Sequence, residues 1–383
     1  MTIACIAVLG DGIEAWLFAA IARQLLRGSV PVMVVPAGPQ SLSDTIALPP
    51  DIERVHRLLR IPPALVRAIA RPRYGIAVPR HDAKALFIPY GGIGDPGTPG
   101  DFAADWIRAR VMGHPPALSS LSVNAALHSG AILPPDAPAE LRRSGTAGWE
   151  AATGRYHSLL REAAQACGVV QSAPWAEPLT AERAAAAWHL ADGTRLTADI
   201  WVDARGDAGV AHSPSPPGWH ADRIGVGTMA QRIDAPEPFA IAAIASAAAR
   251  LVALLPRGPA RSQLAAEYHR QLSCEQDAIA AAGAALSRLA GQDAKSATLD
   301  RYADRYRVAG LLPADPQPWS AETWLFCFDA MGIVPRRYDP NSDRYPVDQA
   351  ADRMTARAMA IARLPGRPRP PPPDGDTCLG RPP

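Results

Sequence analysis

Ile6-Ala7-Val8-Leu9-Gly10-Asp11-Gly12-Ile13-Glu14-Ala15-Trp16 lies near the start of the chain and decides the fold. An apolar run of strand length ends in Gly10-x-Gly12-x-x-Ala15, and an alanine-rich helical pattern follows. This order is typical of a dinucleotide-binding βαβ unit. Gly10 allows the tight turn, Gly12 lets the backbone approach a pyrophosphate, and Ala15 lets the helix pack closely on the strand. The N–H groups at the start of the helix would then bind an anion.

Asp11 places a carboxylate inside this loop. A carboxylate at this position would repel a pyrophosphate, or its side chain would cap the following helix. The second strand ends in Val35-Pro36, without the acidic residue that holds the ribose in many proteins of this fold. A tight turn without a ligand is therefore the alternative to a nucleotide site.

The composition excludes several other classes of protein. The chain has 383 residues, 48% of them hydrophobic, and a net charge of +2, so its basic residues are balanced and do not indicate a nucleic-acid binder. The five cysteines are far apart, and the nine histidines have no metal-ligand spacing, so neither disulfides nor a metal site is expected. No apolar run reaches the ~20 residues of a membrane span, and Ile3–Leu9 resembles a buried strand rather than a signal peptide, so we expect a cytoplasmic protein.

Hydrophobic patterning along the rest of the chain predicts an α/β protein. Strands are expected at Val30–Val35, Tyr74–Val78, Ala85–Ile88, Val169–Ser172 and Ile200–Asp203, with a hairpin of Ala184–Leu190 and Arg195–Ala198 around Asp192-Gly193. Helices are expected at Ile13–Arg27, Asp51–Leu59, Phe102–Met112, Gly154–Cys167, Phe239–Leu255, Gln263–Leu289 and Trp319–Met331, whereas Pro115–Leu141 is expected to be irregular. The Pro/Arg-rich residues 364–383 are predicted to form a disordered tail, with polyproline II at Pro370–Pro373.

Several motifs in the same order resemble the flavin-dependent tryptophan halogenases. Gly10–Trp16 is similar to the family's G-G-G-T-A-G-W, including the tryptophan, and Ser43-Asp44-Thr45-Ile46 stands where the family has G-E-[SA]-T-I. Ala198–Gly206 resembles A-D-L-x-[IV]-D-C-[ST]-G, and Trp324, Gly332–Pro335 and Tyr338–Pro340 resemble the closing W…G-x-x-P…Y-x-P segment.

The resemblance implies a three-layer, glutathione-reductase-like FAD domain with an inserted β region and C-terminal helices. Residues 1–363 would form one unit, with nucleotide-binding segments at about 1–60 and 154–212 and substrate-side segments at about 61–153 and 213–345. It also implies that FAD reduced by a separate flavin reductase, together with oxygen and halide, gives hypohalous acid, which a lysine and a glutamate direct to a small aromatic substrate. The implied cofactor-binding residues are Gly10, Gly12, Ala15, Trp16, Thr45, Asp203 and Gly206.

The sequence departs from the family where the chemistry is expected. Arg73 stands at the lysine position in Arg71–Ile76, and Ser43 stands at the glutamate position. The stretch Leu251–Pro256 lacks both tryptophans of the family's W-x-W-x-I-P, and an alanine-rich helix replaces the G-D/N-A block that lies under the flavin. The sequence therefore predicts an FAD-dependent halogenase or monooxygenase with impaired chemistry. The alternatives are a non-catalytic descendant that serves as a binding protein and, last, a nicotinamide-dependent oxidoreductase.

Overall fold

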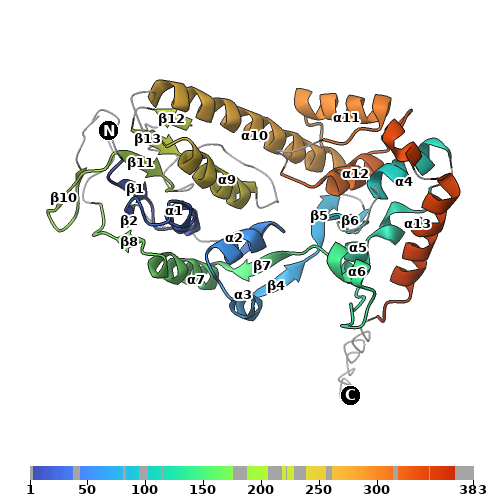
Figure 1. The fold of residues 1–383 in the computed structure, drawn as a ribbon, viewed down its shortest axis with the longest axis horizontal. Helices are drawn as coiled ribbons and strands as arrows, with labels where there is room; N and C mark the ends of the chain where they lie inside the picture. Colours follow the sequence, from blue (N-terminus) through green and yellow to red (C-terminus); the bar gives the residue numbers. More distant parts are fainter. Residues whose placement is uncertain are drawn as a thin grey trace, which may run out of the picture.

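The computed structural model describes residues 3–37, 44–80, 83–94, 102–113, 115–175, 188–205, 218–220, 222–227, 239–255, 261–313, 318–344 and 346–366. A six-stranded sheet at one end of the molecule contains the N-terminal strand (Figure 1). Its order is β12-β13-β11-β1-β2-β8, and its neighbours are parallel except for β12 and β13. The strands are β1 (Ile6–Leu9), β2 (Val32–Val35), β8 (Val170–Gln171), β11 (Ile200–Asp203), β12 (Gly218–His220) and β13 (Arg223–Gly225).

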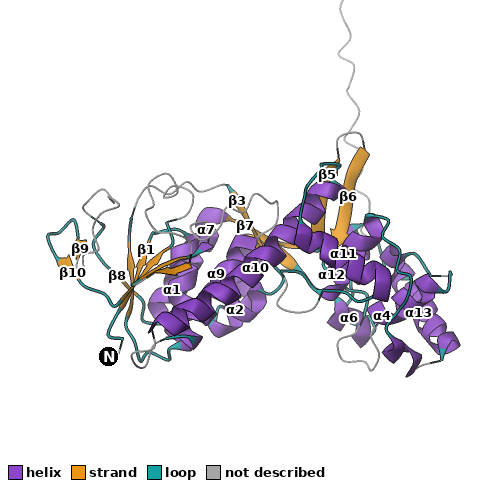
Figure 2. Cartoon of the chain, turned by 90° about the horizontal axis from the view of Figure 1, so that it is seen from above, coloured by secondary structure: helices purple, strands orange, loops and turns teal. Residues whose placement is uncertain are grey.

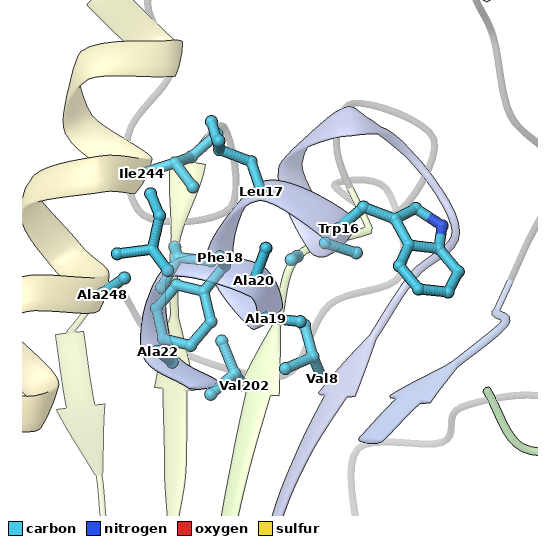
Figure 3. Close-up of a cluster of buried hydrophobic side chains, with 14 of the residues drawn as sticks. Val8, Trp16, Leu17, Phe18, Ala19, Ala20, Ala22, Val202, Ile244 and Ala248 are labelled. Carbon is cyan, nitrogen blue, oxygen red and sulfur yellow. The ribbon is translucent and has the colours of Figure 1, made fainter. Parts of the chain in front are cut away.

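Apolar residues cover both faces of this sheet. On one face lie α1 (Ile13–Leu25), α7 (Thr153–Ala166) and α9 (Phe239–Ala253), which pack into the same large core as β1 and β11 (Figure 2). Figure 3 shows Phe18 of α1 between Val202 of the sheet and Ala248 of α9. On the other face, the hairpin of β9 (Trp188–His189) and β10 (Arg195–Leu196) packs on β1 and β11, largely through Leu190. The predicted three-layer α/β fold is therefore observed.

A second β region joins the two ends of the molecule. It consists of the antiparallel sheet β3-β7-β4 and the hairpin β5-β6. The bounds are β3 (Thr45–Leu48), β4 (Ala70–Arg73), β5 (Gly75–Arg80), β6 (Ala83–Pro89) and β7 (Gly148–Ala152), with the short helices α2 (Ile52–Leu58) and α3 (Pro63–Ile69) between β3 and β4. This region agrees with the inserted β segment expected from the sequence.

Helices gather at the other end, where several of them form a second core together with β5 and β6. They are α4 (Phe102–Val111), η1 (Leu118–Leu121), α5 (Val123–His128), α6 (Ala139–Ser144), α11 (Ala297–Ala309), α12 (Ala321–Ala330), η3 (Pro340–Arg344) and α13 (Val347–Ala362). The long helix α10 (Arg261–Leu289) connects both ends, because Tyr268 belongs to the first core and Ile279–Leu289 to the second (Figure 1). Among the residues that the structure describes, none of the helices combines the length and apolar character of a membrane span.

Three sequence predictions need correction. The stretch Pro115–Leu141 is not irregular, because it contains η1, α5 and the start of α6. Helix α1 ends at Leu25 rather than Arg27, because Arg27 has a φ of 49° and no longer fits a right-handed helix. Helix α12 begins at Ala321 rather than Trp319, because the Ser320 hydroxyl caps it by accepting the N–H of Thr323.

The start of the predicted tail is ordered as far as the structure describes it. Gly366 forms an antiparallel bridge with Ala131, and the N–H of Ile132 donates to the Pro365 carbonyl at 2.7 Å. Residues 367–383, with the predicted polyproline segment, lie outside the described residues.

Candidate functional site

The loop between β1 and α1 has the geometry of a phosphate-binding turn. Gly10 has a φ of +126°, and a Cβ built there would lie 2.6 Å from the carbonyl oxygen of Ala204, so no other residue fits. Gly12 is the N-cap of α1, and among the described residues nothing lies within 4 Å of the position that a Cβ of Gly12 would take. The space beside Gly12, at the helix end where the first N–H groups have no intrahelical acceptor, is therefore one that an anion can enter.

Two residues of the first helical turn make different contacts. Ala15 is fully buried and lets α1 approach the sheet closely. Trp16 is also fully buried, but its indole lies on the side of α1 away from Ile244 (Figure 3). Its Nε1–H donates to the Oδ1 atom of Asp11 at 2.9 Å. Asp11 precedes the N-cap residue Gly12, and its carboxylate accepts the indole N–H.

The carbonyl of Asp11 is held from a second direction. Nε2 of His157, on α7, lies 2.7 Å from this carbonyl oxygen. A second acidic side chain, Glu14, lies in the first turn of α1 and packs against the end of β13, where a Cβ on Gly227 would meet its Oε2 atom at 2.2 Å. Glu14 thus lies against a neighbouring element, whereas α7 contacts Asp11 through its backbone carbonyl and Trp16 of α1 contacts its carboxylate.

The structure brings the C-terminal end of β11 next to this loop. Asp203 is the register partner of Leu9, directly before Gly10. Its carboxylate accepts two hydrogen bonds from Arg205, from Nε at 2.8 Å and from Nη2 at 2.6 Å, and both side chains are only 5% exposed. A paired carboxylate next to the loop adds less negative charge there than an isolated one would. Gly206, the other predicted residue of this segment, lies outside the described residues.

Thr45 is exposed at the start of β3. It is the register partner of Ala152, the residue before the helix that carries His157. The end of β2 supplies no acidic residue among the described Pro36 and Ala37.

Arg73, at the family's lysine position, lies in the second β region instead. It is the last residue of β4 and the register partner of Gly148, and it is half-buried. Its guanidinium lies over the Tyr90 ring, 5.8 Å from the ring centroid. Lys84 lies at the opposite end of the β5-β6 hairpin, where Arg80 pairs with Ala83, so it does not take the place of Arg73. Ser43 lies outside the described residues.

Sequence reasoning missed a carboxylate close to Tyr90. Oε2 of Glu322, in the first turn of α12, accepts the N–H of Gly92 at 2.7 Å and that of Ile93 at 3.3 Å. Gly91 and Gly92 have φ values of +71° and +81°, which aim successive N–H groups at one anionic oxygen. The glycine-rich sequence after Tyr90 and the glutamate after the Ser320 cap were the available signals, but nothing in the sequence connected them.

A large surface cavity lies elsewhere. It has a volume of about 640 Å³ and lies between the β5-β6 hairpin and helices α10, α11 and α12. Two of its arginines, Arg288 and Arg307, form ion pairs with Asp300 and Asp304. Among the described residues, no group of three or more His, Cys, Asp or Glu side chains could hold a metal ion.

Comparison with protein-family models identifies the family to which the loop, α7 and β11 belong. The model described as tryptophan halogenase matches residues 5–213, which include the loop, α7 and β11. The chain belongs to the tryptophan halogenase family. A comparison with curated protein sequences gives no match.

Solved structures agree with the assignment of the fold. BrvH, a flavin-dependent halogenase from Brevundimonas sp. BAL3, matches with a TM-score of 0.73 at 18% identity, over 95% of this chain and 97% of its own. A flavin-dependent halogenase from Xanthomonas campestris gives 0.73 at 18% identity, over 96% and 97%. A tryptophan 6-halogenase from Streptomyces toxytricini gives 0.69 at 13% identity, over 96% and 98%. This tryptophan halogenase family member thus has the halogenase fold over nearly its whole length.

Proposed function

We propose that this chain binds FAD and acts as an FAD-dependent halogenase or monooxygenase on a small aromatic substrate, with impaired halogen transfer. A separate flavin reductase in the cytoplasm would supply the reduced FAD. The observation that carries the proposal is the loop before α1. Position 10 accepts only a glycine, and the space beside Gly12 at the start of the helix is open among the described residues.

The residues present fit the phosphate part of a dinucleotide. The N–H groups that follow Gly12 would hold the pyrophosphate, and the backbone at the end of β11, beside Leu9, would approach the adjoining part of the cofactor. Since β2 ends without an acidic residue, the ribose would be held more weakly than is usual in this fold. When bound and reduced, FAD supplies the oxygen-activating chemistry of flavin-dependent enzymes.

Arg73 is the reason to propose impaired halogen transfer. Its guanidinium is permanently charged and can orient a neutral electrophile by hydrogen bonding. It does not deprotonate in proteins, so it cannot supply the free amine that a lysine offers to hypohalous acid. Its contact with the Tyr90 ring further restricts the side chain to one orientation.

A matched pair of variants tests the cofactor site. Gly12→Ala and Gly154→Ala both add a methyl group where nothing lies within 4 Å, so neither should destabilise the fold measurably. Only Gly12 faces the proposed pyrophosphate. We expect Gly12→Ala to weaken FAD binding about tenfold or more, measured by flavin fluorescence quenching, and Gly154→Ala to leave it unchanged. A wild-type protein that shows no flavin binding in this titration would refute the proposal.

Activity is tested with a flavin reductase, FAD, NADH, bromide or chloride, and a panel of indoles. We expect slow or undetectable halogenation by the wild-type chain. Arg73→Lys together with Ser43→Glu should increase product formation, detected by mass spectrometry. Halogenation at a rate that this double variant does not raise would show that Arg73 does not limit the chemistry.

The second candidate is a non-catalytic binding protein descended from the family. Its support is the segment Leu251–Pro256, at the place of the family's W-x-W-x-I-P. The structure describes its first three residues as the last turn of α9, without the two tryptophans. This candidate is favoured if FAD binds and the double variant still gives no product.

A further inference from the structure

We infer that Trp16 and His157 are positioning residues that hold Asp11 in place, and so allow an acidic residue to stand inside a pyrophosphate-binding loop. This inference rests on the proposed FAD binding. It also explains why a carboxylate at position 11 is compatible with that function.

The bond from His157 fixes the backbone of the loop. A carbonyl oxygen can only accept, so Nε2 of His157 carries the proton and donates it to the Asp11 carbonyl at 2.7 Å. His157 and Asp11 are 146 residues apart in the sequence, and this hydrogen bond joins α7 to the loop. With its carbonyl directed at α7, the peptide group between Asp11 and Gly12 has one fixed orientation, and its N–H belongs to Gly12.

Neighbouring contacts hold His157 itself. The residue before it, Tyr156, is fully buried, and its hydroxyl lies 3.0 Å from Nε2 of His56 on α2. Helix α7 also packs along α1 in the large core, through Leu160 and Ala164. The backbone that carries the imidazole is therefore anchored in the large core.

The hydrogen bond from Trp16 fixes the position of the Asp11 carboxylate in the loop. Asp11 precedes the N-cap, so a rotation of its side chain could bring the carboxylate over the N–H groups of α1. The bond from Nε1 of Trp16 holds Oδ1 at the edge of the indole instead. A buried indole has one N–H donor and little freedom, so it is well suited to hold a carboxylate in one position.

The size of the effect follows from Coulomb's law. A carboxylate about 6 Å from a phosphate charge, at an effective dielectric constant of about 40, weakens binding about tenfold. Without the indole N–H, the Asp11 carboxylate can turn to the N–H groups of α1 and compete with the phosphate there. We therefore expect Trp16→Phe, which removes this one hydrogen bond, to weaken FAD binding about tenfold beyond any loss from the smaller ring.

A double-mutant cycle separates charge from packing. Trp16→Phe is compared in the wild-type background and in an Asp11→Asn background, where the smaller ring remains but the carboxylate is gone. We expect the tenfold loss in the first background and less than about threefold in the second. Equal losses in both backgrounds would refute the role of Trp16.

His157 is tested by a conservative rescue. His157→Phe removes the donor and should weaken FAD binding, whereas His157→Gln keeps an N–H donor and should restore most of the affinity. Equal affinities for wild type, His157→Phe and His157→Gln would refute the role of His157.

A measurement without flavin separates this inference from the proposed function. Hydrogen exchange of the peptide that covers residues 9–17 should become faster in His157→Phe than in His157→Gln or wild type. If the wild type binds no FAD but shows this difference, the proposed function fails and the positioning role of His157 stands. If FAD binds and neither affinity nor exchange changes in any variant, the positioning role fails and the proposed function stands.

Discussion

His56 makes the stability of the end of this protein that contains the six-stranded sheet dependent on pH. It lies on α2 with 5% of its surface exposed, and its Nε2 atom is 3.0 Å from the hydroxyl of Tyr156 on α7. Burial lowers the pKa of His56 from 6.5 to about 4. Acidification is therefore the perturbation, because the native protein resists a proton that the unfolded chain takes up.

The sign and the size of the effect follow from this pKa difference. Above pH 6.5 His56 is neutral in both states, so its full contribution to stability is present. Between pH 6.5 and 4 the unfolded chain binds the proton and the native state does not, so the free energy of unfolding falls as the pH falls. The loss reaches about 2 kcal/mol at pH 5 and about 3 kcal/mol below pH 4.

The matched control replaces both partners at once. In the double variant His56→Phe and Tyr156→Phe, two rings of similar shape fill the same space and no buried polar atom of the pair loses its partner, so stability at pH 7 should change little. Urea unfolding followed by far-UV circular dichroism at pH 7 and pH 5 gives the comparison. The pKa of His128 is also lowered, by burial and then by Lys84, but that contribution is common to both proteins and cancels.

The wild type should lose about 2 kcal/mol more between pH 7 and pH 5 than the double variant. Equal losses in the two proteins would show that His56 is protonated as readily in the native state as in the unfolded chain. The reasoning from burial would then be refuted.

Three other substitutions have defined expectations in urea unfolding experiments. Gly10→Ala should cost about 2–4 kcal/mol, because a Cβ there meets the carbonyl of Ala204 and the φ is positive; a smaller cost would mean that the loop can relax. Arg357→Met should cost about 3 kcal/mol or more, because this buried side chain donates to carbonyl groups, including that of Gly92; an Arg357→Lys variant that is equally unstable would argue for packing over hydrogen bonding. Glu322→Gln should cost about 1 kcal/mol, because a neutral oxygen is a weaker acceptor for the two N–H groups; unchanged stability would contradict this.

Three strands of the sheet, β1, β2 and β11, could be predicted because each is an apolar run between turn residues, whereas β12 and β13 have only three residues each and show no such run. The observed strand Ile200–Asp203 has the predicted bounds, and β1 and α1 follow from the loop sequence. Short helices could not be found in this way. A helix of six residues such as α5 has fewer than two turns, which is too few to show an apolar period.

Helix α13 shows a second reason why sequence reasoning fails. Its buried positions are Ala350, Met354, Arg357 and Ile361, at helical spacing. The arginine interrupts the apolar stripe, and it is buried because distant backbone carbonyls and Glu140 accept its hydrogen bonds. Such partners come from the tertiary fold, so the sequence pattern cannot reveal them.

The candidate site also contains some residues that could be predicted from the sequence and others that could not. Gly10, Gly12 and Ala15 could be found because their spacing is local and each has a steric reason. The bond from Trp16 to Asp11 could not, because Asp11 precedes the helix and the usual i,i+4 rule does not cover this pair. The bond from His157 joins segments that are far apart in the sequence, and it exists only because α7 packs on α1.

Two of the departures from the family, Asp11 and Arg73, have different consequences in this fold. Asp11 adds a negative charge that is unfavourable for a pyrophosphate. The Trp16 indole N–H holds this carboxylate, so the N-terminus of α1 stays open. Arg73 changes the chemistry of a side chain, and a neighbour such as Tyr90 can orient the guanidinium without making it an amine. We therefore expect cofactor binding and halogen transfer to respond to different substitutions. We expect substitutions around Asp11 to change flavin affinity, and Arg73→Lys to change product formation at unchanged flavin affinity.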